Sequence, residues 1–219
     1  MKFTEYLFEE VKDIWNDYLN HKFICELGQG ILDEEKFKYY LIQDYLYLKE
    51  YAKVFCIGAV KAKTMKEMKF YYSSIKGTME DETAVHINYL RNFGVNIDEL
   101  EKYKFNVITK NYTSYMQSIA LTGNLKEIAV AIMPCTWSYN YIGKYLINKY
   151  KDKIEKNFYK DWIEEYASKE FEEFTERWIN YIDELCENIN EEEKERLLDI
   201  FIRCSVYEMD FWNMAYKTI

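Results

Sequence analysis

Residues that interrupt helices are scarce in this sequence. Its 219 residues include one proline and seven glycines. Proline breaks the hydrogen-bond ladder of a helix and glycine weakens it, so their scarcity favours long helices. No segment alternates steadily between apolar and polar residues, the pattern typical of strands. Without a linker, repeat or low-complexity tract, the chain is expected to be all-α, a single-domain helical bundle over residues 1–219.

Signals for several partners and compartments are also missing. No apolar run approaches the roughly 18 residues that span a bilayer, and residues 1–10 carry acids without a signal-peptide core. The net charge is −9 with acids and bases interspersed, which excludes the basic stripe of a nucleic-acid binder. The five cysteines form no CxxC pair and suit a reducing compartment. We expect a cytoplasmic protein with neither a nucleic-acid nor a membrane partner.

Motifs for metals and cofactors are absent as well. There are two histidines, and the paired Glu-x-x-His motifs of a di-iron bundle do not occur. The sequence has no glycine-rich phosphate loop, no Walker lysine and no GxSxG. A lone histidine such as His21, at a helix end, is more often a cap or core residue than a haem ligand. His86 lies four residues after Glu82, so the two can share a hydrogen bond. No metal and no cofactor are expected.

Apolar residues, half of the chain, recur with helical spacing. Tyrosine is abundant, at 22 residues, and can line a pocket as well as a core. Two predicted helices begin at the caps Thr4 and Asp33. Three more are predicted over residues 53–63, 65–92 and 109–122. The last three begin at the caps Asn124, Ser168 and Asn190, and the first of these runs to about Tyr150.

Three reactive residues lie on faces that are otherwise apolar. Asp44 is surrounded by aromatic and aliphatic positions of one helix, and Glu208 by those of the last helix. A buried carboxylate costs several kcal/mol unless it is paired, so each is either part of a site or a structural pair. Cys135 follows Pro134, which must disturb its helix. From spacing alone, an inert core thiol is the better interpretation of Cys135.

Five segments resemble blocks of the TenA/thiaminase II family, in its cysteine-bearing branch. They are residues 43–48, 112–116, 133–139, 162–168 and 207–216. The Pro-Cys-x-Trp block and the terminal Tyr-Glu-x-x-Phe-Trp block are the most specific, and the similarity extends from the first helix to the last. The resemblance implies a haem-oxygenase-like fold without haem, and a homotetramer.

The resemblance also implies roles for individual residues. Cys135 corresponds to the nucleophile that adds to the pyrimidine ring, and Glu208 to the acid/base residue. Asp44 corresponds to the residue that binds the amino group and neighbouring nitrogen of the ring. The implied walls of the substrate site are Tyr47, Tyr112, Tyr139, Tyr166 and Phe211. The chemistry is coherent, because a free thiol, with a pKa of about 8.5, needs a base within reach.

The predicted function is therefore hydrolysis of a small-molecule pyrimidine. The expected substrate is 4-amino-5-aminomethyl-2-methylpyrimidine, converted to the hydroxymethyl compound and ammonia in thiamin salvage. Cleavage of thiamin to hydroxymethylpyrimidine and thiazole is an expected second activity. Two alternatives stay open: a non-catalytic pyrimidine-binding or regulatory protein, and a haem-oxygenase-like metalloenzyme.

Overall fold

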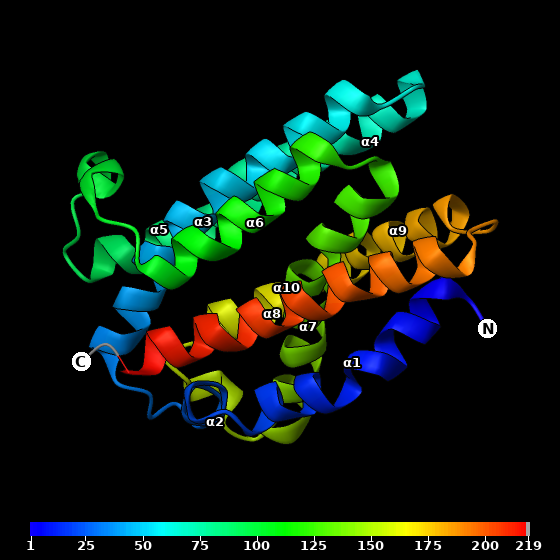
Figure 1. Ribbon diagram of the computed structural model, residues 1–219. Coiled ribbons are helices and arrows are strands. Elements are labelled where there is room, and N and C mark those ends of the chain that lie inside the picture. The colour runs from blue at the N-terminus through cyan, green and yellow to red at the C-terminus, as the bar shows by residue number, and fades with distance from the viewer. Residues whose placement is uncertain (218–219) are drawn as a thin grey trace. The chain divides into compact units, whose positions relative to one another are not determined.

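The computed structural model describes residues 1–217, apart from the side chains of residues 81 and 82. Every regular element in this described part is a helix, which confirms the all-α prediction. The elements are α1 Phe3–Asn20, α2 Lys22–Gln29, α3 Glu34–Lys61, α4 Met65–Lys76, the π-helix η1 Gly77–Glu82, α5 Thr83–Asn92, the 3-10 helix η2 Ile97–Lys102, α6 Val107–Thr122, α7 Leu125–Lys149, the 3-10 helix η3 Ile154–Lys156, α8 Lys160–Ala167, α9 Lys169–Leu185 and α10 Glu191–Lys217 (Figure 1). None of these helices is long and apolar enough to cross a membrane.

Side-chain caps fix several of these boundaries. The carboxylate of Asp33 accepts hydrogen bonds from the first backbone amides of α3, and the Ser168 hydroxyl accepts one at the start of α9. Asn190 caps α10 in the same way. These three predicted caps are confirmed, whereas the predicted cap at Thr4 is wrong. Thr4 lies inside α1, where its hydroxyl donates to Asp183 at 2.9 Å and ties α1 to α9.

Two stretches differ from the predicted helices. The separate helix expected over 53–63 is the second half of α3, which continues through Gly58. A Cβ at Gly58 would lie 2.2 Å from the Tyr71 ring, so the glycine allows α4 to pack closely there. The helix expected over 65–92 is divided by η1, where the Thr83 hydroxyl donates to the carbonyl of Thr78 at 2.7 Å. Residue Gly94, with φ of 71°, ends α5 as expected.

The chain divides into two compact units. Unit 1 comprises residues 1–32 and 129–213, and unit 2 comprises residues 33–128 and the C-terminal residues from Met214. One division falls between α2 and α3, and the other two fall within α7 and α10. The single-domain assignment stays a prediction.

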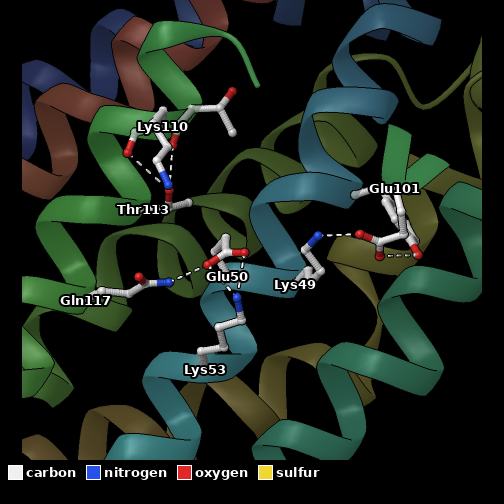
Figure 2. A network of polar contacts seen from close by, with 9 residues as sticks. Lys49, Glu50, Lys53, Glu101, Lys110, Thr113 and Gln117 are labelled. Carbon is white, nitrogen blue, oxygen red and sulfur yellow. Dashed lines mark hydrogen bonds and ion pairs between the residues drawn. The ribbon is translucent and has the colours of Figure 1, made fainter. Parts of the chain in front are cut away.

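Unit 2 is built around α3. This helix packs against α4 and α6, and Figure 1 shows α3 and α6 side by side. A polar network joins them: Glu50 accepts hydrogen bonds from Lys53 at 2.8 Å and from Gln117 of α6 at 2.6 Å (Figure 2). Burial raises the pKa of Glu50, but these bonds and the charges of Lys53 and Lys49 outweigh it and hold the pKa below its ordinary value.

Unit 1 has a core rich in aromatic rings. Helix α1 packs against α2 and α9, and α8 packs against α9. All five tryptophans of the chain belong to this unit, and four of them are fully buried: Trp15, Trp162, Trp178 and Trp212. Such rings bury large apolar areas and supply much of the stabilisation of a core.

Candidate active site

Asp44 is buried in unit 2 within a small polar cluster. Its carboxylate is 3% exposed and lies on the inward face of α3. The hydroxyl of Tyr40, one turn earlier, donates to Oδ2 of Asp44 at 3.5 Å. Nδ1 of His86, on α5, lies 3.2 Å from the same oxygen. Residue spacing could not predict this last contact, because more than twenty residues separate α3 from α5.

The histidine beside Asp44 is neutral. The 3.2 Å separation has the length of an ion pair, but His86 is almost completely buried. Burial lowers the pKa of His86 to about 3, so the imidazole carries no charge at neutral pH. His86 therefore contributes no positive charge to the cluster around Asp44. The expected bond between His86 and Glu82 lies outside the described side chains.

Two of the predicted tyrosine walls lie together in unit 2. Tyr47, one turn after Asp44 on α3, packs against Tyr112 of α6 with ring centroids 5.1 Å apart. Tyr51 also stacks on Tyr47, with ring centroids 5.4 Å apart. All three rings are at most 3% exposed. Their arrangement holds Tyr47 in place beside Asp44.

Cys135 and Glu208 are the reactive groups of unit 1. Cys135 lies on α7 directly after Pro134, through which the helix continues, and Glu208 lies on α10. Both are buried, at 6% and 2% exposed. Both also lie close enough to Tyr18 of α1 for their charges to raise the pKa of its hydroxyl. The charges of both side chains therefore act on one tyrosine, although 73 residues of sequence separate them.

Tyr139 and Tyr166 meet where α7 packs against α8. Their ring centroids are 4.7 Å apart in an edge-to-face arrangement, and Tyr139 also lies 5.2 Å from Trp212. Asn140 donates to the backbone carbonyl of Tyr166 at 2.9 Å. Gly143 makes the close approach feasible, since a Cβ there would lie 2.7 Å from the Tyr166 backbone. Tyr139 follows Cys135 by one turn, so its ring and the thiol share one face of α7.

The predicted site residues thus form two groups. Asp44, Tyr47 and Tyr112 belong to unit 2. Those of unit 1 are Cys135, Tyr139, Tyr166, Glu208 and Phe211, which is buried one turn after Glu208. That the two groups form one pocket stays a prediction. Among the described residues, no cluster of three or more His, Cys, Asp or Glu side chains is arranged to hold a metal.

Comparison with known proteins decides the family. A model of the TENA/THI-4/PQQC family matches residues 8–218. A protein from Helicobacter pylori named aminopyrimidine aminohydrolase is 38% identical over 218 residues, which cover both chains completely. The chain belongs to the TENA/THI-4/PQQC family. The resemblance inferred from the five sequence blocks is confirmed.

Solved structures support the same assignment. A TenA homologue from P. horikoshii OT3 superimposes on this TENA/THI-4/PQQC family member with a TM-score of 0.89 at 27% identity, covering 99% of each chain. A Shewanella denitrificans OS217 domain described as having a heme oxygenase-like fold superimposes with a TM-score of 0.75 at 16% identity, covering 98% of this chain and 92% of that one. The second comparison bears on the fold alone and confirms the predicted haem-oxygenase-like architecture.

Sequence reasoning missed two neighbours of the site in this TENA/THI-4/PQQC family member. Tyr18 is not among the residues that the sequence assigns to the site, because its hydroxyl donates to the backbone of Ser205, 187 positions away. His86 was assigned to Glu82, four residues before it on the expected helix. His21 is placed as expected: its Nδ1 accepts from the Phe23 amide at 3.2 Å and caps α2.

Proposed function

We propose that this chain is an aminopyrimidine aminohydrolase of thiamin salvage. It converts 4-amino-5-aminomethyl-2-methylpyrimidine and water to the hydroxymethyl compound and ammonia. The observation that carries the proposal is the burial of both Cys135 and Glu208 in unit 1, in a chain 38% identical over its full length to a protein named for this activity. Cleavage of thiamin at the same methylene is the proposed second activity.

Cys135 and Glu208 divide the proposed chemistry between them. Glu208 takes the proton of the Cys135 thiol, the thiolate adds to a ring carbon next to a ring nitrogen, and Glu208 passes the proton to that nitrogen. The exocyclic C–N bond of the protonated aminomethyl group then breaks, and the amine leaves as ammonia. Water adds to the methylene carbon and gives a proton to Glu208. The C–S bond then breaks as the ring nitrogen releases its proton to solvent, and Glu208 returns its proton to the thiolate. A thiol is a competent nucleophile only as its thiolate, so the nearby carboxylate is essential.

The remaining predicted residues bind the flat ring. The carboxylate of Asp44, beside the neutral imidazole of His86, accepts hydrogen bonds from the ring amino group and a protonated ring nitrogen. Tyr47, Tyr112, Tyr139, Tyr166 and Phe211 supply the stacking surfaces and hydroxyl donors. We further propose that the enzyme is cytoplasmic and assembles as a homotetramer.

Product analysis tests this function. Purified protein is incubated with the aminomethylpyrimidine and, separately, with thiamin, and products are identified by mass spectrometry alongside an ammonia assay. We expect hydroxymethylpyrimidine from both, and no turnover by Cys135→Ser, because a hydroxyl is a far weaker nucleophile. The control is Cys186→Ala, which alters a buried cysteine at the end of α9 and should leave turnover intact.

Calorimetry separates the proposal from its alternatives. Cys135→Ser should still bind hydroxymethylpyrimidine, because its binding groups are unchanged. Binding by the wild type without any turnover would instead indicate a non-catalytic pyrimidine-binding protein. Turnover by Cys135→Ser near the wild-type rate would disprove nucleophilic catalysis.

A further inference from the structure

Two aromatic side chains of α1 bind the same residue of α10. Trp15 and Tyr18 are three residues apart, so they are neighbours on one face of the helix, and both are fully buried. The indole Nε1–H of Trp15 donates to Oγ of Ser205 at 3.1 Å. The hydroxyl of Tyr18 donates to the backbone carbonyl of Ser205. Ser205 is thus held through its side chain and its backbone at once.

Ser205 lies one turn before Glu208. Side chains of a helix lean toward its N-terminus, so the Glu208 side chain leans back over the turn that contains Cys204 and Ser205. The electrostatics agree with this placement. Burial and the charge of Glu208 raise the pKa of the Cys204 thiol, against a smaller opposing influence of Arg203. The α10 turn that α1 holds is therefore the turn beneath the Glu208 carboxylate.

Tyr18 remains a hydrogen-bond donor throughout the working pH range. Burial, followed by the charge of Glu208, raises the pKa of its hydroxyl well above 10, with smaller contributions from Cys204 and Cys135. The hydroxyl keeps its proton and cannot serve as the base for the Cys135 thiol. Its hydrogen bond to Ser205 persists whatever the protonation state of the thiol or the carboxylate.

We propose that Tyr18, supported by Trp15, is a positioning residue that fixes the Glu208 carboxylate relative to the Cys135 thiol by holding Ser205 in place. The inference rests on the proposed function and deepens it. Removing the Tyr18 hydroxyl leaves α10 able to rotate or slide slightly at Ser205. Proton transfer between a carboxylate and a thiol requires hydrogen-bond distance, so a small displacement lowers the rate of the chemical step while the ring-binding residues keep their geometry.

The chain provides a matched control for the loss of a buried tyrosine hydroxyl. The hydroxyl of Tyr159, also in unit 1 and 1% exposed, donates to the backbone carbonyl of Leu32 in the same way. Tyr18→Phe and Tyr159→Phe each remove one oxygen and one such bond. Their costs to folding should be similar, so a difference in activity isolates the effect on the site.

The experiment compares kinetics of these two variants with the wild type. We expect Tyr18→Phe to lower kcat by about 10- to 100-fold, the scale of a small misplacement of catalytic groups. KM should change less than about twofold, and the acidic limb of the kcat profile against pH should shift. Tyr159→Phe should keep the wild-type kcat and profile. Equal kcat values for the two variants would overturn the inference.

A second measurement does not depend on turnover. The rate at which iodoacetamide alkylates Cys135, followed by mass spectrometry of its peptide across pH, reports how readily Glu208 deprotonates the thiol. Tyr18→Phe and Ser205→Ala should both shift this profile, and Tyr159→Phe should not. If the wild type lacks turnover but Tyr18→Phe shifts the profile, the proposed function fails while the positioning role stands. An unshifted profile with normal turnover overturns the positioning role alone.

Discussion

The buried carboxylates Asp44 and Glu208 invite a test that separates a catalytic role from a structural one. A carboxylate that pairs with a buried cation strands that cation when it is neutralised, at a cost of several kcal/mol. Two groups that lie beside Asp44 are the Tyr40 hydroxyl and the imidazole of His86, whose pKa burial lowers to about 3. A catalytic carboxylate that is incompletely paired in the ligand-free protein instead carries a burial cost that folding offsets elsewhere.

We therefore expect Asp44→Asn and Glu208→Gln to lose most activity and to keep or raise the melting temperature. The gain should be on the order of 1 kcal/mol in stability. Thermal melts without ligand at neutral pH, paired with turnover assays below the melt, provide the measurement. A large drop in melting temperature for both variants, with activity retained, would identify them as structural pairs.

Protonation of His86 should make the free energy of unfolding depend on pH below about 6.5. Its pKa is about 3 in the folded protein and about 6.5 in the unfolded chain. As pH falls below about 6.5 the unfolded chain binds the proton first, so the free energy of unfolding decreases, by up to about 1.4 kcal/mol per pH unit. Few carboxylates titrate between pH values of about 6.5 and 5, so the contribution of His86 to the slope of unfolding free energy against pH can be measured there.

Denaturant unfolding at several pH values checks this expectation. His86→Gln, which keeps a neutral hydrogen-bonding side chain, should remove most of the slope between about pH 6.5 and 5. Identical slopes in the variant and the wild type would show that the histidine titrates normally in the folded protein.

At the scale of the helix, the sequence predicted the boundaries that are set by contacts between residues close together in the chain. Asp33, Ser168 and Asn190 mark helix starts because their side chains bind the amides two or three residues ahead. The short helices α2 and α8 were missed, because eight residues give too little periodicity. The division of 65–92 by η1 also escaped prediction, since it depends on how the turn packs rather than on a helix breaker.

For the site residues too, the sequence predicted positions within one helix but not contacts between helices. The helical face that carries Asp44 could be inferred from spacing, and so could that of Glu208. The contact of Asp44 with His86 and that of Tyr18 with Ser205 join different helices, so they required the tertiary structure.

The crossing of α7 and α8 yields a prediction at this scale. Gly143→Ala would place a Cβ 2.7 Å from the backbone of Tyr166, which cannot rotate away as a flexible side chain would. We expect a loss of about 1–3 kcal/mol in stability and a higher KM for the pyrimidine, because Tyr166 moves with α8. Gly77→Ala is the matched control, since no atom lies within 4 Å of its Cβ. Equal stability of the two variants would contradict the close packing.

At the scale of the whole molecule, the single-domain prediction can be decided by cooperativity. Helices occur in both units, so far-ultraviolet circular dichroism follows the unfolding of the entire chain. If the two units form one domain, all probes should report one coincident transition. Two separated transitions in a denaturant titration would contradict the prediction.

The confinement of all five tryptophans to unit 1 gives this experiment its second probe. Selective excitation of indole produces fluorescence from unit 1 alone, because unit 2 contains tyrosine but no tryptophan. The intrinsic fluorescence of the unaltered chain therefore acts as a regional label, without a dye or an engineered reporter. A destabilising substitution in unit 2, such as Gly58→Ala, should shift the fluorescence midpoint only if the two units unfold together.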